Sequence, residues 1–90
     1  MRFRVEYSSG AENFLKKAEK SLAKRIIAKI ESLAKTPLIP DSQKIEGNEK
    51  IFRVRVGAYR ILYEVDFREK LVGIIKIDKR EKFYRKSKKS

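Results

Sequence analysis

The chain has 90 residues and a formal charge of +12, from 24 Lys and Arg against 12 Asp and Glu. This length fits one domain with a modest core, and the charge favours a polyanionic partner, most commonly nucleic acid. Cysteine and histidine are absent from the sequence, which excludes disulfides, thiolate metal sites and histidine general bases. The sequence shows neither a signal-peptide pattern nor an apolar run of membrane-spanning length, so we expect a cytoplasmic protein with no membrane partner.

The first part of the chain is predicted to form a strand and then helices. Residues 2–7 alternate between polar and apolar side chains, as in a strand with one buried face. Ser9 followed by Glu12 is a capping-box pattern, which predicts a helix start. Apolar residues then recur at helical spacing, and the polar segment 19–21 favours two helices over one continuous helix. The dipeptide Thr36-Pro37 ends the helical run, because proline cannot continue its hydrogen bonding.

The second part is predicted to form strands. A short strand at 44–46 precedes a turn at 47–49, and the segment 52–65, FRVRVGAYRILYEV, alternates on both sides of Gly57 as a hairpin does. A reversal at 66–69 leads into a last strand at 70–78. The predicted order is β-α-α-β-β-β(-α), an α+β fold in which a helical pair packs on one face of a small, mainly antiparallel sheet.

One face of the predicted hairpin gathers cations. Arg53 and Arg55 alternate with the apolar residues of its first strand, and Arg60 does so in the second. Lys76 from the last strand and Arg80 just beyond it extend the cluster. An ordinary solvated sheet face is the alternative interpretation, but like charges on adjacent strands cost stability. This surface is therefore the candidate functional site.

The alternation also predicts apolar residues on the arginine face. Leu62, Val72 and Ile74 fall there by their parity, while Leu71, Ile75 and Ile77 fall on the core face. Apolar side chains among arginines indicate a surface that a partner or the protein's own tail covers.

The C-terminal tail, residues 79–90, carries seven basic residues and one acidic residue. Phe83 and Tyr84 lie within it, and each could stack on an unpaired base or anchor the tail to the sheet. If the polyanion is RNA, the expected contacts are Lys76, Lys79, Lys82, Arg85 and Lys86. A glycine-rich phosphate loop and a metal-ligand cluster are both absent from the sequence, so we expect neither a metal nor a cofactor.

The segments KIEG, IFRVRVGAYRILYEV and IKIDKREKFY resemble the RelE/ParE superfamily of toxins from toxin–antitoxin systems. The resemblance spans essentially the whole chain. It implies a single RelE-like toxin domain over residues 1–90, with the RelE-like microbial RNase fold and a basic tail at 79–90. RelE-like members are ribosome-dependent endoribonucleases that cut messenger RNA in the A site, whereas the ParE-like branch inhibits DNA gyrase.

The resemblance to RelE-like members also implies a catalytic set and partners. Its members would be Arg53, Arg55, Arg60, Arg80 and Tyr84, acting without a metal through attack of the ribose 2′-oxygen on the adjacent phosphate. The implied partners are messenger RNA, the ribosome and a RelB-like antitoxin encoded nearby. A ParE-like gyrase inhibitor and an inactive paralogue that binds RNA or an antitoxin are the alternatives.

Two of these positions depart from some members of the family, which carry lysine where this chain has Arg53 and Arg55. Arginine is essentially never deprotonated, so the two residues are expected to bind phosphate and not to accept a proton. Tyr84 is then the best candidate for the general base, and Glu64 is a weaker one.

Overall fold

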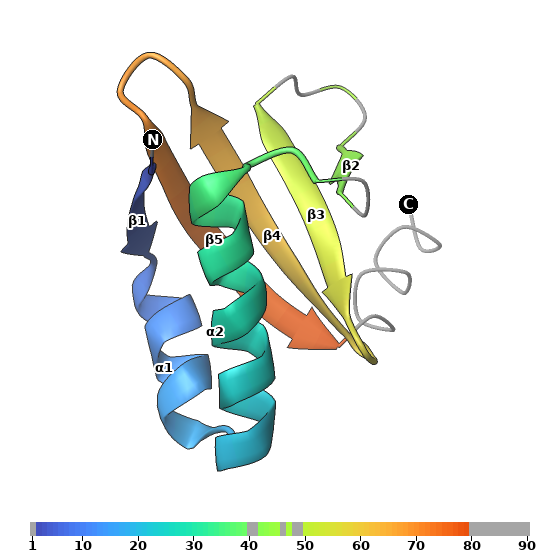
Figure 1. Cartoon of the computed structure of the whole chain (residues 1–90). Helices are drawn as coiled ribbons and strands as arrows, with labels where there is room; N and C mark the ends of the chain where they lie inside the picture. Colours follow the sequence, from blue (N-terminus) through green and yellow to red (C-terminus); the bar gives the residue numbers. More distant parts are fainter. Residues whose placement is uncertain (1, 40–41, 46, 48–49, 80–90) are drawn as a thin grey trace.

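A mixed sheet with two helices on one face makes up the described part of the computed structural model, residues 2–39, 42–45, 47 and 50–79. The elements are β1 (Arg4–Tyr7), α1 (Ser9–Lys17), α2 (Lys20–Lys35), β2 (Gln43–Lys44), β3 (Ile51–Val56), β4 (Tyr59–Asp66) and β5 (Leu71–Lys79). The strand order is β1-β5-β4-β3-β2, and only β1 and β5 are parallel neighbours. Figure 1 shows α1 and α2 side by side in front of this sheet. The α+β class is therefore confirmed, while the terminal helix expected in the tail lies outside the described residues.

The first helix is capped by Ser8, so the prediction that Ser9 is the cap was wrong. The Ser8 hydroxyl accepts a hydrogen bond from the Ala11 amide at 3.1 Å and donates one to the Ile75 carbonyl at 2.7 Å. Ser8 keeps extended backbone angles, and helical geometry begins at Ser9. The contact with β5 selects between two adjacent serines that look equivalent in the sequence.

The two predicted helices are confirmed, although the break between them falls slightly before the polar segment 19–21. The break between α1 and α2 falls at residues 18–19, and α2 ends at Lys35 just before Thr36-Pro37. The chain leaving α2 is held to the sheet by Tyr63, whose hydroxyl donates a 2.7 Å hydrogen bond to the Pro37 carbonyl. Burial raises the pKa of the Tyr63 hydroxyl.

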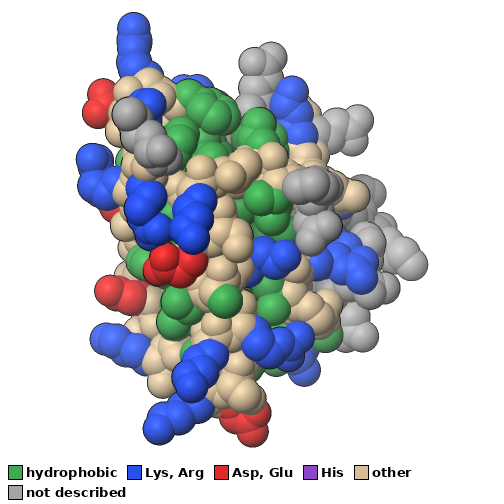
Figure 2. All heavy atoms as spheres, in the orientation of Figure 1, with side chains coloured by type: hydrophobic (Ala, Val, Ile, Leu, Met, Phe, Trp, Pro, Cys, Tyr) green, Lys and Arg blue, Asp and Glu red, His purple; other side chains and the backbone are tan. Residues whose placement is uncertain are grey.

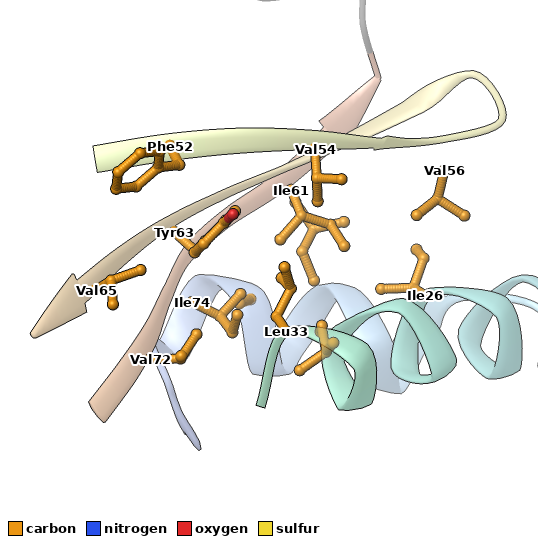
Figure 3. Packing of buried hydrophobic residues seen from close by; sticks show 13 residues of the cluster. Ile26, Leu33, Phe52, Val54, Val56, Ile61, Tyr63, Val65, Val72 and Ile74 are labelled. Carbon is orange, nitrogen blue, oxygen red and sulfur yellow. The ribbon is translucent and has the colours of Figure 1, made fainter. Parts of the chain in front are cut away.

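The hydrophobic core lies between the helices and the inner face of the sheet (Figure 3). Phe52 and Tyr63 stack from neighbouring strands with ring centroids 5.8 Å apart. The helix that contributes most to this core is α2. Its fully buried side chains and those of the sheet include Ile26, Ile30, Leu33, Val54, Ile61, Tyr63, Val72 and Ile74.

A β-bulge interrupts the pairing of β4 with β5. Leu62 pairs with Lys76, but the next residue, Tyr63, pairs with Ile74, which leaves Ile75 as an extra residue in β5. An extra residue shifts the alternation of the bulged strand by one position. Side chains before and after the bulge can therefore face the core even though their sequence parity differs.

The bulge corrects the assignment of the faces of β5. Val72, Ile74 and Ile77 are all in the core, with 0%, 1% and 4% of their surface exposed. The prediction that Val72 and Ile74 lie on the arginine face was wrong, and so was the placement of Leu71 and Ile75 in the core, since both are only half-buried. Unlike Val72 and Ile74, Leu62 does lie on the arginine face, where it is half-buried.

Candidate functional site

Two rows of side chains cross the outer face of the sheet. One row follows the strand register through Gln43, Arg53, Leu62 and Lys76, and the next contains Arg55, Arg60 and Asp78. Residues two apart in a strand share a face, so the rows lie side by side. The hairpin predicted at 52–65 is confirmed, and it brings the three arginines together as expected.

The three arginines line one cavity of about 460 Å³. Its wall comprises Gln43, Arg53, Val54, Arg55, Gly57 and Arg60. The cavity lies beside the end of β2, which pairs with β3 only at Phe52 and Arg53. Planar guanidinium groups bind the oxygens of phosphate through parallel hydrogen bonds, so this cavity has the chemistry of a phosphate site.

The arginines differ in how they are held. Arg53 donates from Nε and Nη2 to the Gln43 side-chain oxygen, at 3.2 and 3.1 Å, so its guanidinium is fixed against β2. Arg60 is 4% exposed and forms a buried part of the wall. Arg55 is exposed and makes no ion pair with any carboxylate that the structure describes.

Other predicted residues lie outside this cavity. Lys76 shares the outer face, but Leu62 separates it from Arg53, and its ammonium lies 3.9 Å from the Asp78 carboxylate. Lys79 is exposed at the end of β5. Glu64 lines a different hollow, beside Asp66, and does not reach the arginines.

The predicted tail residues are outside the described part of the chain. Arg80 and Tyr84, expected in the catalytic set, are among them, as are the expected RNA contacts Lys82, Arg85 and Lys86. Their roles stay predictions.

Gln43 in the cavity wall and Arg25 beside Gly57 were both missed by the sequence patterns. Gln43 was missed because the strand predicted at 44–46 lies at Gln43–Lys44, with Glu46 outside the described residues. Arg25 was missed because its approach to the hairpin depends on how α2 packs. Its Nη2 atom lies only 2.7 Å from the position that a Cβ on Gly57 would occupy. The signal for such a contact is tertiary, so helical periodicity alone does not reveal it.

Membrane-spanning helices and metal-binding clusters were also considered. The described helices are all too short or too polar to cross a membrane. In the same part of the chain, no three carboxylates gather closely enough to hold a metal ion.

Known proteins resemble this chain over most of its length. Residues 5–84 match the family model described as the ParE toxin of the type II toxin–antitoxin system parDE. The putative toxin RelE1 of Methanocaldococcus jannaschii is 31% identical over 88 residues, covering 94% of this chain and 98% of that protein.

Solved structures show the same fold. A chain of the archaeal RelE–RelB complex from Pyrococcus horikoshii has a TM-score of 0.77 and 28% identity, covering 89% of this chain and 97% of that one. A mutant of the Escherichia coli toxin RelE in the free state has a TM-score of 0.79 and 19% identity, covering 97% of this chain and 93% of that one.

Proposed function

The chain belongs to the RelE/ParE superfamily of toxins from type II toxin–antitoxin systems, and we propose that it is an endoribonuclease that cleaves messenger RNA in the ribosomal A site and so inhibits translation. The observation that supports this proposal most directly is the cavity lined by Arg53, Arg55 and Arg60. Solved relatives form complexes with RelB antitoxins, so the proposed regulatory partner is a RelB-like protein encoded nearby.

The proposed reaction is an internal phosphoryl transfer. The ribose 2′-oxygen attacks the adjacent phosphorus, the bond to the 5′-oxygen breaks, and the products carry a 2′,3′-cyclic phosphate and a 5′-hydroxyl. Negative charge builds on the non-bridging phosphate oxygens as the new bond forms. Guanidinium groups that are already oriented stabilise this charge without reorganising. Arg53, fixed by Gln43, is suited to that role.

The proton transfers need other groups. The 2′-hydroxyl must lose a proton and the departing 5′-oxygen must gain one, and such general acid–base terms contribute roughly 10² to 10⁴ in rate. Arg53 and Arg55 remain charged, so they are poor bases. Tyr84 as base and Arg80 as the group beside the leaving oxygen are the assignments that the family resemblance implies. Glu64 is less suited, because it lines a separate hollow.

A gyrase inhibitor is the second candidate, because the matching family model is that of ParE toxins. Such a protein would block DNA supercoiling and leave messenger RNA intact. The arginine cavity and the 31% identity to a RelE-type relative favour the ribonuclease.

Primer extension on a message translated with the purified protein tests the choice. We expect new 5′ ends of the downstream fragments within the coding region only when ribosomes are present. Arg80→Ala should reduce this cleavage by orders of magnitude, while Arg68→Ala, at the turn between β4 and β5, serves as the matched control. Inhibited supercoiling alongside an intact message would instead identify the gyrase branch.

A further inference from the structure

Arg25 of α2 reaches the tip of the hairpin that carries the candidate site. Its Nη2, Cζ and Nη1 atoms lie 2.7, 3.7 and 3.9 Å from the position of a Cβ on Gly57. Gly57 itself lines the arginine cavity. The guanidinium of Arg25 therefore lies beside Gly57 at the hairpin tip, next to the cavity, although it does not line the cavity and comes from the helical layer of the fold.

The charge of Arg25 is not neutralised by the described carboxylates. The side chain is exposed, and the ion pairs among the described residues do not include it. Arg55, which lies nearby on β3, is in the same situation. Two exposed guanidinium groups without acidic partners among the described residues therefore lie at the hairpin end of the sheet, and their combined positive potential favours an anion there.

Several cations in the first half of α2 oppose the stability of the helix. Its first turn contains no acidic residue, and the cations Lys20 and Lys24 oppose the positive end of the helix dipole. Lys20 and Lys24, like Arg25 and Lys29, are like-charge pairs at a spacing of four residues, which destabilises a helix. Glu31, the one carboxylate within α2, is already in an ion pair. Figure 2 shows basic side chains spread over this helical face, with acidic ones between them. A helix that keeps such cations at a cost is suited to contact a polyanion.

We propose that the RNA-binding surface continues from the arginine cavity over the hairpin tip onto α2, and that Arg25 binds a phosphate neighbouring the one that is cleaved. This inference rests on the proposed ribonuclease function and adds a positioning residue to it. Gly57 allows the arrangement, because a side chain at this position would displace the guanidinium of Arg25.

Binding of an uncleavable RNA tests the inference. The probe is a fluorescent single-stranded RNA whose 2′-hydroxyls are methylated, and the readout is anisotropy over a series of salt concentrations with the full chain. Arg25→Gln should weaken binding several-fold and lower the slope of log affinity against log salt by about 0.7, the value for one lost phosphate contact to a single strand. The control, Arg68→Gln, removes the same exposed charge from the turn at the far end of the hairpin and should do neither.

Further variants separate a phosphate contact from a structural role. Arg25→Lys keeps the charge and should restore most of the affinity, whereas a role in holding the hairpin in place would show as a lowered unfolding temperature in Arg25→Gln. Equal losses in Arg25→Gln and Arg68→Gln, or no loss in either, would overturn the proposal. Unchanged RNA affinity with weakened binding of the antitoxin would assign Arg25 to the protein partner and would also overturn it.

The cleavage assay distinguishes this inference from the proposed function. If the wild-type protein fails to cut ribosome-bound message but Arg25→Gln binds RNA more weakly than Arg68→Gln, the ribonuclease proposal fails and the RNA surface remains. If the wild-type protein cuts the message and Arg25→Gln binds RNA normally, the inference about Arg25 alone is wrong.

Discussion

Arg55 on β3 and Arg60 on β4 lie directly opposite each other in the register of the hairpin, so two like charges meet across neighbouring strands. Such a pair is destabilising, by an amount on the order of 0.2–1 kcal/mol. The two residues differ in burial, because Arg60 is 4% exposed whereas Arg55 is exposed to solvent. The repulsion can therefore be relieved at Arg55 without opening the interior.

Arg55→Gln should separate stability from function. We expect its unfolding temperature to be equal to or above that of the wild-type protein, because the repulsion with Arg60 is gone. Cleavage of ribosome-bound message should fall by about 10²-fold, as when one charge-stabilising donor is removed from an active site. Circular dichroism during heating and primer extension measure the two effects. A fall in stability that accounts for the lost cleavage would instead show that Arg55 has a structural role.

Gly57→Ala should destabilise the protein chiefly through its backbone, with a smaller contribution from the contact with Arg25. Gly57 has a φ of +60°, where an L-residue with a Cβ costs roughly 1–2 kcal/mol. The added Cβ would also lie 2.7 Å from Nη2 of Arg25, so the guanidinium must move. Arg25→Ala removes the second cost, so Gly57→Ala should lower the free energy of unfolding less in that background than in the wild type. Urea unfolding of the four proteins in this cycle gives the coupling, and strict additivity would mean that Arg25 does not press on Gly57.

The hairpin was predictable from sequence, whereas the faces of β5 were not. In β3 and β4 the apolar residues follow one parity, apart from Ile51 and Leu62 on the outer face, so parity identifies the core face. The segment 71–78, LVGIIKID, has apolar residues at both parities, and the bulge at Ile75 decides which of them turn inward. That bulge is set by the pairing with β4 and by the hydrogen bond from the Ser8 hydroxyl to the Ile75 carbonyl. Neither contact is local in sequence.

The residues at the candidate site likewise divide into those that the sequence pattern predicts and those that depend on tertiary packing. Arg53, Arg55 and Arg60 follow from the alternation of a single hairpin, so the sequence was enough to group them. Gln43 joins the cavity wall through the pairing of β2, and Arg25 approaches Gly57 through the packing of α2, and no local pattern specifies either contact. The catalytic roles of these residues stay predictions, because the positions of the side chains do not test which of them takes part in the reaction.

Paired alanine variants in β5 test the corrected core. Ile74 is 1% exposed, and Ile74→Ala should lower the free energy of unfolding by about 2–5 kcal/mol through lost burial and the cavity left behind. Ile75 is half-buried at the bulge, so Ile75→Ala should cost clearly less. Chemical denaturation measures both. A larger loss at Ile75 than at Ile74 would contradict the bulge and restore the uninterrupted alternation.

Tyr63→Phe should change how stability depends on pH. The buried hydroxyl donates to the Pro37 carbonyl at 2.7 Å, and burial raises its pKa above the ordinary value of 10.0. The unfolded chain therefore ionises first, and the stabilising effect of Tyr63 is complete below about pH 10 and is lost as the pH rises towards the folded-state pKa. At neutral pH the variant should be less stable by about 1 kcal/mol, because the carbonyl loses its donor.

The difference in unfolding free energy between the wild-type protein and Tyr63→Phe should therefore shrink as the solution becomes alkaline. Tyr7, whose pKa is raised by burial and secondly by the Glu31 carboxylate, remains in both proteins, so the variant keeps part of the alkaline decline. Tyr7→Phe is the matched control, since it removes a tyrosine that is 36% exposed and leaves the hydrogen bond of Tyr63 to Pro37 intact. Urea unfolding at neutral pH and above about pH 10 supplies the comparison. A constant difference between Tyr63→Phe and the wild type would mean that Tyr63 ionises equally well in the folded and unfolded chains, whereas no difference at neutral pH would mean that the chain leaving α2 is not held to the sheet by this hydroxyl.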